Sequence, residues 1–590
     1  MRKAPIFRPL ILCIAVLTIS LASADGNAAK KAGAAGEIVE GDLAKKLDMY
    51  LTRITPFGFS GALFVAKDGK VILNKGYGMA IRAKNVPNTS GTVFSTGSIT
   101  KQFTAAGIMK LEMMGKLKTE DPITKYFDNV PEDKKTITLH NLLTHTSGVI
   151  DFTGMDFEVA PRDETMQKIL DAPLRHKPGE QFAYSNAGYS MLAAVIEKVS
   201  GQSYEEFMNK NIFTPSGMAF TGYRIPEWDK KVVAHWYRGE KDNGTPLEKN
   251  YPYWNYLGNG GILSTTEDMY KWHQALLEDK VLSAPVKKKM FAPFLNEYGY
   301  GWDIIQREMG TLIQHDGGSM LGCSAEFRRY IDAKIVTMVF CNQSYGQRAL
   351  FEAVRDKIEM LVFGGEVAIP PEVSAQQPDK LLKFVGTYKL ATGGQLQVKR
   401  EDKTIVISAH GQDAISVLFE PGNPDPVRFE ELNKLAASVF EAALKGDYEP
   451  FGNVLANKER RMKPVQELIE MRLRMYKPRT GEIKNVKSLG TLSSTLDGEK
   501  VAMTYVELKG EKGSMFFELY WQDSKNVGVG PAPPPGEMAL PFLPVSESEF
   551  VGYKIDSAVG AKIGFKMDDS GSVIGLVIPG DQDFMAPKHK

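Results

Sequence analysis

One serine and one lysine stand three residues apart in Ser98-Ile-Thr-Lys101, the only Ser-x-x-Lys in the chain. Phe103, Ile108 and Leu111 follow at helical spacing, so the pair is expected at the start of a buried helix. A helix places residues three apart on one face, which brings the lysine amine beside the serine oxygen. A serine is a weak nucleophile until an adjacent base takes its proton, and a desolvated lysine can be that base. The pair therefore predicts covalent catalysis by serine.

Two further elements lie downstream, Tyr184-Ser-Asn186 and His315-Asp-Gly317, the second followed by Gly318 and a strand-like run. Each of the three elements also has an ordinary structural interpretation. Ser98 could cap a helix beside an exposed Lys101, Tyr184 could be a packing residue and Asn186 a cap, and His315 could be a histidine of the core. A second Tyr-x-Asn, Tyr253-Trp-Asn255, shows that one such element decides nothing. The order and context of all three carry the interpretation.

That order resembles the serine β-lactamase and penicillin-binding protein superfamily, in particular the branch of class C β-lactamases, D-Ala-D-Ala carboxypeptidases, D-aminopeptidases and esterases. The resemblance covers roughly residues 45 to 362. Its other supporting segments are Phe94–Ser98, Leu142–Gly148, Lys177–Gly179, Gly258–Thr265 and Tyr298–Trp302.

The resemblance implies a role for each residue. Ser98 is the acylated nucleophile, Lys101 its partner base, and Tyr184 a proton shuttle to the leaving group; which of Lys101 and Tyr184 is the general base stays open. Asn186 binds the amide-like part of the substrate. His315 binds a carboxylate or tunes Tyr184. The backbone N–H groups of Ser98 and Gly318 form the oxyanion hole.

His315-Asp-Gly317 departs from the Lys-Thr-Gly of class C β-lactamases by losing a permanent cation and a hydroxyl. Recognition of a β-lactam carboxylate is weakened, so we expect an esterase or D-peptidase more than an efficient β-lactamase. The preferred function is an exported serine hydrolase that forms an acyl-enzyme with an ester, D-amino-acid peptide or amide. The alternatives are a weakly catalytic or non-catalytic peptidoglycan- or peptide-binding protein, and an interaction module in residues 380 to 590.

Export is expected from the N-terminal segment. Arg2, Lys3 and Arg8 precede an apolar run ending near Leu21, and Ala22-Ser-Ala24 has the small-residue pattern of a cleavage site. The run is too short for the ~20 residues of a membrane-spanning helix. We expect a signal peptide at 1–24, a periplasmic or secreted protein, and no stable membrane insertion after cleavage.

Composition limits the partners. Lys plus Arg number 72 and Asp plus Glu 71, so no charge excess favours nucleic acid, and a small molecule or short peptide is the expected substrate. His140 and His145 are five residues apart, which does not match the His-x-x-x-His zinc spacing. No metal and no cofactor are expected, and the oligomeric state is left open.

The fold expected for residues 42–363 is an α/β (α+β) β-lactamase-like domain, with an antiparallel sheet built from both ends of the segment and a helical lobe between. A helix is expected at 42–54, hairpins at Ala66–Gly69 and at 313–341, and helices at Met191–Val199 and Asp268–Leu277. The site would lie between sheet and helices. Residues 25–41 are expected to be a disordered lead-in.

After a linker at 364–380, Phe384–Tyr388 and Phe550–Tyr553 begin similar strand-like segments, which resemble a lipocalin-like β-barrel at 381–425 and 537–590. Residues 426–536 resemble an inserted NTF2- or cystatin-like α+β domain with a proline-rich return. Within it we expect helices at 429–445 and 465–475, then strands at 500–508, 514–521 and 525–529. Cys323 and Cys341 would lie nearly opposite each other in one hairpin; a disulfide and two buried thiols are both open.

Overall fold

The computed structural model describes residues 36–239, 241–249, 251–344, 348–370, 372–374, 378–401, 404–419, 425–496, 499–532, 539–553, 560–579 and 584–589. The segment expected to be a signal peptide, 1–24, and most of the segment expected to be a disordered lead-in, 25–41, lie outside these residues. At the end of the second segment, however, Ile38–Val39 form a strand where disorder was expected. Within them, no helix is both long enough and apolar enough to cross a membrane.

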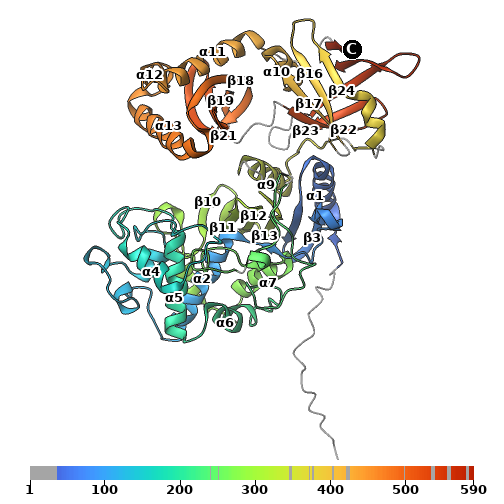
Figure 1. Ribbon diagram of the computed structural model, residues 1–590. Coiled ribbons are helices and arrows are strands. Elements are labelled where there is room, and N and C mark those ends of the chain that lie inside the picture. Colours follow the sequence, from blue (N-terminus) through green and yellow to red (C-terminus); the bar gives the residue numbers. More distant parts are fainter. Residues whose placement is uncertain are drawn as a thin grey trace, which may run out of the picture.

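The first body of the molecule is built on a seven-stranded sheet in the order β1-β3-β2-β13-β12-β11-β10, antiparallel throughout (Figure 1). As expected, strands from both ends of this part of the chain meet, because β13 pairs with β2. The bounds are β1 Ile38–Val39, β2 Gly61–Lys67, β3 Lys70–Tyr77, β10 Asp303–Arg307, β11 Gly310–Ser319, β12 Cys323–Tyr330 and β13 Ile335–Cys341.

Helices cover both faces of this sheet. α1 (Gly41–Ile54) and α9 (Arg348–Val362) pack on one face with side chains such as Leu63 and Val65. On the other face lies a helical lobe, whose core includes Phe64 and belongs to α2 (Thr100–Met113), α5 (Asn186–Ser200) and α7 (Thr266–Leu277). Successive strand residues point to opposite faces, so one strand serves both cores. The shorter helices are α3 Leu139–Leu143, α4 Arg162–Asp171, α6 Tyr204–Met208 and α8 Ala284–Met290.

Cys323 and Cys341 are both buried thiols that form no disulfide. Cys341 pairs with Ser324, and Cys323 pairs with Ser319, so the cysteines are one register position from being opposite. A shift of one residue turns a side chain to the other face of the sheet. Cys341 accordingly packs with the α1 and α9 core, and the disulfide alternative is excluded.

The second body contains an eight-stranded antiparallel sheet in the order β15-β16-β17-β22-β23-β24-β25-β26. Its two edges approach each other, because Tyr388 of β15 forms a bridge with Lys588 just after β26, and a nearly closed barrel results. Its likeness to a lipocalin stays a prediction. The strands are β15 Gly386–Lys389, β16 Gln395–Glu401, β17 Thr404–His410, β22 Ala539–Pro544, β23 Glu549–Tyr553, β24 Gly560–Met567, β25 Val573–Ile578 and β26 Phe584–Pro587.

Between β17 and β22 the chain forms a four-stranded antiparallel sheet, β18-β19-β20-β21, with helices on one face. Sequence patterns indicated the last three strands but not β18, whose Lys, Ser and Gly residues dilute its alternation. Pro464 and Pro478 lie inside α13, which is why the sequence indicated only 465–475 for that helix. The elements are α10 Gln412–Phe419, α11 Pro426–Ala443, α12 Glu449–Val454, α13 Lys458–Thr480, β18 Ile483–Leu496, β19 Glu499–Gly510, β20 Ser514–Gln522 and β21 Lys525–Ala532.

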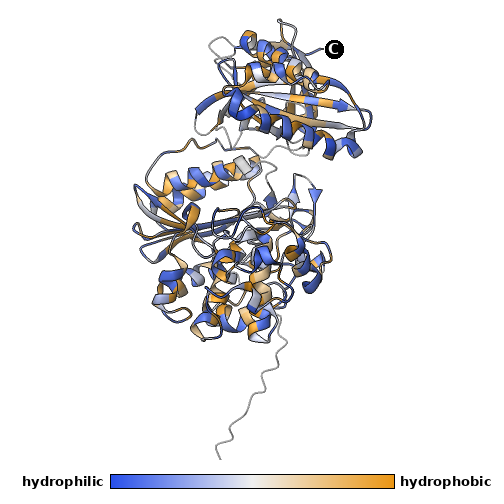
Figure 2. Cartoon of the chain, turned by 90° about the vertical axis from the view of Figure 1, so that its left-hand side faces the viewer, coloured by the Kyte–Doolittle hydropathy of each residue, from blue (hydrophilic) through white to orange (hydrophobic). Residues whose placement is uncertain are grey.

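The two bodies touch at the face of the first sheet that α1 and α9 cover. The ring of Tyr553, at the end of β23, lies 5.4 Å from the ring of Phe57, and the ammonium of Lys357 lies 5.8 Å from the Tyr553 ring. Figure 2 shows the same arrangement from the side, with hydrophobic and hydrophilic residues alternating along the helices. This contact is on the opposite side of the sheet from α2, the helix that follows Ser98.

Candidate active site

Ser98 lies in the short 3-10 turn Gly97–Ile99, directly before α2. Its neighbours Gly97 and Ile99 are buried, whereas Ser98 itself is partly exposed and accessible to a substrate. Lys101 stands one turn later and is completely buried, with its Nζ atom 3.1 Å from the Oγ atom of Ser98. The helical start expected from the sequence is present and brings these two groups together.

Three oxygen atoms surround the Lys101 amine. Besides Ser98 Oγ, the Oδ1 atom of Asn186 and the backbone oxygen of Asn259 each accept a hydrogen bond of 2.7 Å from Nζ. A neutral amine has two hydrogens and one lone pair. When the hydrogens go to Asn186 and Asn259, the lone pair remains for the Ser98 hydroxyl, which is the arrangement that a general base requires.

Burial lowers the pKa of Lys101 to about 7, because a charged ammonium loses its hydration there. Asp151, Asp316 and Asp156 oppose this change through their negative charges. A large fraction of the amine is therefore neutral near pH 7.

Tyr184 lies on the other side of the same group, with the Lys101 ammonium 4.8 Å from its ring centre. Burial raises the pKa of Tyr184 well above 10, and a hydrogen bond with Ser98 only partly offsets this. Tyr184 is consequently a neutral phenol, and of the two candidate bases Lys101 loses its proton more readily. The ring of His145 packs against Tyr184 with 4.1 Å between ring centres.

The backbone around Ser98 packs directly against β11. A methyl group added at Gly317 would lie 2.2 Å from the oxygen of Thr96 and 2.6 Å from the nitrogen of Ser98, and one at Gly97 would lie 2.3 Å from the nitrogen of Gly318. Two glycines thus allow the backbone nitrogens of Ser98 and Gly318 to approach the same region, as an oxyanion hole needs.

Asn186 is the first residue of α5, whose N-cap is Ser185. Its side-chain oxygen accepts a hydrogen bond from Lys101 and so positions the amine, and the substrate-binding role expected for Asn186 stays a prediction. Its Nδ2 atom donates to Asp151, 3.0 Å away.

His315 is buried on β11, and both of its ring nitrogens are engaged within the protein. Nε2 lies 2.9 Å from the Tyr298 hydroxyl, and Nδ1 lies 2.6 Å from the backbone oxygen of Asp316. Because only Nδ1–H can donate to that backbone oxygen, Nε2 accepts from Tyr298 in the neutral ring. The Tyr298 ring meets that of Tyr184 edge-on at 6.5 Å, so His315 reaches the site through Tyr298.

Asp316 is paired with Glu326 across β11 and β12. Directly paired residues point to the same face, and Glu326 contacts Arg355 of α9. Asp316 therefore points to the face opposite His315, as the alternation of a strand predicts.

Sequence reasoning missed Asp151, Asn259, His145 and Tyr298 as parts of the site. Three of them lie in or next to segments already singled out, Leu142–Gly148, Gly258–Thr265 and Tyr298–Trp302, but nothing in a single chain shows that these segments meet at Lys101. Asp151 follows the first segment by three residues and has no motif of its own.

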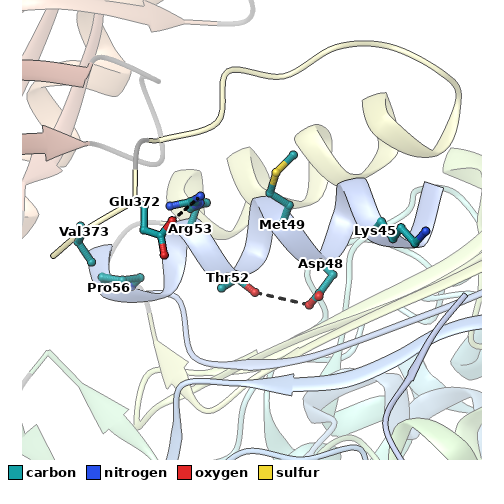
Figure 3. Close-up of a pocket in the computed structure, with 8 residues that line it drawn as sticks. All are labelled: Lys45, Asp48, Met49, Thr52, Arg53, Pro56, Glu372 and Val373. Atoms are coloured by element: carbon teal, nitrogen blue, oxygen red, sulfur yellow. Dashed lines mark hydrogen bonds and ion pairs between the residues drawn. The ribbon is translucent and has the colours of Figure 1, made fainter. Parts of the chain in front are cut away.

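Away from Ser98, a metal site and a surface hollow are the other candidate functional sites. In the described part of the chain, no group of three or more His, Cys, Asp or Glu side chains could hold a metal ion. A hollow on the outer side of α1, lined by Lys45, Asp48, Arg53 and Glu372 among others, is closed at one end by the 3.1 Å ion pair of Arg53 and Glu372 (Figure 3). It lies on the α1 and α9 face, away from Ser98.

The chain is similar in sequence to a known protein family and to several curated proteins. The family model described as Beta-lactamase matches residues 57–358. Penicillin-binding protein 4* of Bacillus subtilis (strain 168) is 29% identical over 387 residues, which are 60% of this chain and 84% of that protein. The putative penicillin-binding protein PbpX of the same organism is 36% identical over 263 residues, 44% of this chain and 65% of the relative, slightly less than two thirds of its length.

Among solved structures, the octameric penicillin-binding protein homologue from Pyrococcus abyssi is 24% identical and matches with a TM-score of 0.50. The match covers 81% of this chain and 96% of that one. This likeness supports the fold.

Proposed function

The chain belongs to the Beta-lactamase family, and on that premise we propose that it is an exported serine hydrolase that forms an acyl-enzyme at Ser98. The observation that carries the proposal is the buried Lys101 amine, which lies 3.1 Å from the Ser98 hydroxyl and has its hydrogens directed to two other acceptors. In the ordinary structural interpretation, with Ser98 as an N-cap, Lys101 would be exposed to water and would not be fixed by these hydrogen bonds.

In acylation, the neutral Lys101 amine takes the Ser98 proton while Oγ attacks the carbonyl carbon of the substrate. The backbone N–H groups of Ser98 and Gly318 stabilise the oxyanion of the tetrahedral intermediate. The phenol of Tyr184 then gives its proton to the leaving alcohol or amine and regains one from Lys101. Water releases the acyl group by the same steps in reverse, and Ser98 recovers its proton.

For the substrate we propose an ester, a D-amino-acid peptide or an amide, in preference to a β-lactam. Both nitrogens of His315 are occupied by Tyr298 and by its own strand, so residue 315 offers no free cation to a substrate carboxylate. The carboxylates of Asp151 and Asp156 lie close enough to Lys101 to influence its pKa. They would therefore also repel the carboxylate of a β-lactam bound beside Lys101. The signal-like segment at 1–24 supports export to the periplasm or the outside.

The second candidate is a binding protein that acylates slowly or not at all, and the barrel and the four-stranded α+β unit favour it, because they add surfaces that hydrolysis does not need. Intact-mass measurement after incubation with a fluorophosphonate separates the two. We expect one adduct per chain in the wild type and none in Ser98→Ala, followed by turnover of small esters. An unlabelled wild type, or equal labelling of Ser98→Ala, would overturn the hydrolase proposal.

A further inference from the structure

Asp151 lies at the beginning of a loop that crosses the N-terminus of α5. One of its carboxylate oxygens, Oδ1, accepts two hydrogen bonds of 3.0 Å, from the backbone nitrogen and from the Nδ2 atom of Asn186. The backbone oxygen of Asp151 accepts a third, 2.8 Å long, from the nitrogen of Ala187. The residue is thus fixed to the first turn of the helix, where a negative charge is favoured.

A continuous chain of hydrogen bonds connects Asp151 to Ser98. Asp151 accepts from Asn186, the Oδ1 atom of Asn186 accepts from Lys101 at 2.7 Å, and Lys101 lies 3.1 Å from Ser98. A side-chain amide has two orientations that differ by exchange of its oxygen and nitrogen. Only the orientation with nitrogen toward Asp151 presents an acceptor to Lys101.

We propose that Asp151 is a positioning residue of the acylation reaction, whose carboxylate fixes the Asn186 amide so that its oxygen, and not its NH₂ group, faces Lys101. The inference rests on the proposed function of Ser98 and Lys101. Without Asp151 the amide can turn, and an NH₂ group toward Lys101 competes for the lone pair that the serine proton needs. Misplacement of a catalytic base by about 1 Å can cost on the order of 100-fold in rate.

Asp151 also acts on Lys101 through its charge, and the two effects must be separated. Two more carboxylates act on Lys101 through their charges, Asp156 of the same loop as Asp151 and Asp316, which lies on β11 and points to its other face. The rings of His145, Tyr184 and Tyr189 also lie near the amine. Asp156 supplies the matched control, because it acts on Lys101 by charge but forms no hydrogen bond with Asn186 among the described residues.

The experiment compares Asp151→Ala, Asp151→Asn and Asp156→Ala in the full chain, by the rate of fluorophosphonate labelling of Ser98 between pH 5 and pH 10. Removing either carboxylate withdraws a charge that favours the ammonium, so the rising limb of the pH profile moves to lower pH in all three. Asp151→Ala lowers the plateau rate by roughly 10- to 100-fold, whereas Asp156→Ala leaves it unchanged. Asp151→Asn keeps an acceptor for Asn186 and recovers much of that loss.

A plateau for Asp151→Ala within threefold of that for Asp156→Ala overturns the proposal. Melting temperatures identify a variant that fails to fold, and in that case the plateau of Asp151→Asn decides, because its rate must lie below that of Asp156→Ala. Nitrogen NMR of lysine-labelled protein carrying Ser98→Ala measures the pKa of Lys101 without turnover. If the wild type takes no label, the proposed function fails, whereas an unchanged Lys101 signal in Asp151→Ala contradicts the positioning role.

Discussion

Gly317 lies so close to Ser98 that a methyl group added to its Cα would stand 2.6 Å from the Ser98 backbone nitrogen. Position 317 must therefore be glycine, because the backbones of β11 and of the turn that carries Ser98 are in contact there. Any side chain at this position would push β11 away from that turn. The distance between β11 and that turn therefore sets the space between the backbone nitrogens of Ser98 and Gly318, the two donors of the proposed oxyanion hole.

Gly317→Ala should reduce the rate of Ser98 labelling on the order of 100-fold, because an oxyanion donor displaced from its place loses most of its effect. Gly530→Ala is the matched control, since a methyl group at Gly530 meets nothing within 4 Å. Rapid-quench labelling with intact-mass detection gives both rates. Wild-type labelling by Gly317→Ala would show that the hole lies elsewhere.

The pH dependence of labelling should follow Lys101. Its pKa is lowered to about 7 by burial, and only the neutral amine accepts the serine proton. The rate should rise about tenfold per pH unit below pH 7 and level off above it. The same rates measured on Lys101→Ala should be at least 100-fold lower at every pH, and a wild-type rate that is flat from pH 5 to pH 9 would exclude Lys101 as the base.

Stability should fall in mild acid partly because of His273. Burial, helped by the charge of Arg329, lowers its pKa to about 3, whereas the unfolded chain has a pKa near 6.5. Between these values the unfolded state binds a proton that the folded state does not, so stability decreases as pH falls, by up to about 1.4 kcal/mol per pH unit.

Exchange of His273 for glutamine should therefore reduce the loss of melting temperature between pH 7 and pH 5. His410→Gln, at an exposed position on β17, serves as the control and should melt in parallel with the wild type. Equal pH slopes for wild type and His273→Gln would refute the assignment.

Cys323 and Cys341 should titrate as thiols in unfolded protein that has never been reduced, because they form no disulfide and lie on opposite faces of their hairpin. In the native protein the reaction should be slow, since both are buried and burial raises the pKa of Cys323 to about 12. Thiol counting in denaturant, with and without prior reduction, tests this. A count that increases after reduction would reveal a bridge.

Local patterns were sufficient for many of the regular elements, but not for β18 or for the full length of α13. The helix expected at 42–54 is observed as Gly41–Ile54, and the turn at Ala66–Gly69 joins two paired strands. Both were predictable because the spacing of apolar residues along the sequence differs between helices and strands. For the later hairpin, the sequence placed Cys323 and Cys341 nearly opposite each other, and they are one register position from being opposite. Because β13 is apolar on both faces apart from Thr337, the pattern alone did not decide which faces Cys323 and Cys341 occupy.

The sequence by itself determined the proximity of Ser98 and Lys101, since residues three apart at the start of a helix lie on one face. The tertiary structure alone decided what surrounds this pair. Asn186 and Asn259 reach the amine across 85 and 158 residues of chain, and Asp151 acts through Asn186. The lowered pKa of Lys101 comes from the packing that removes water around it, and packing between distant segments leaves no local trace in a sequence.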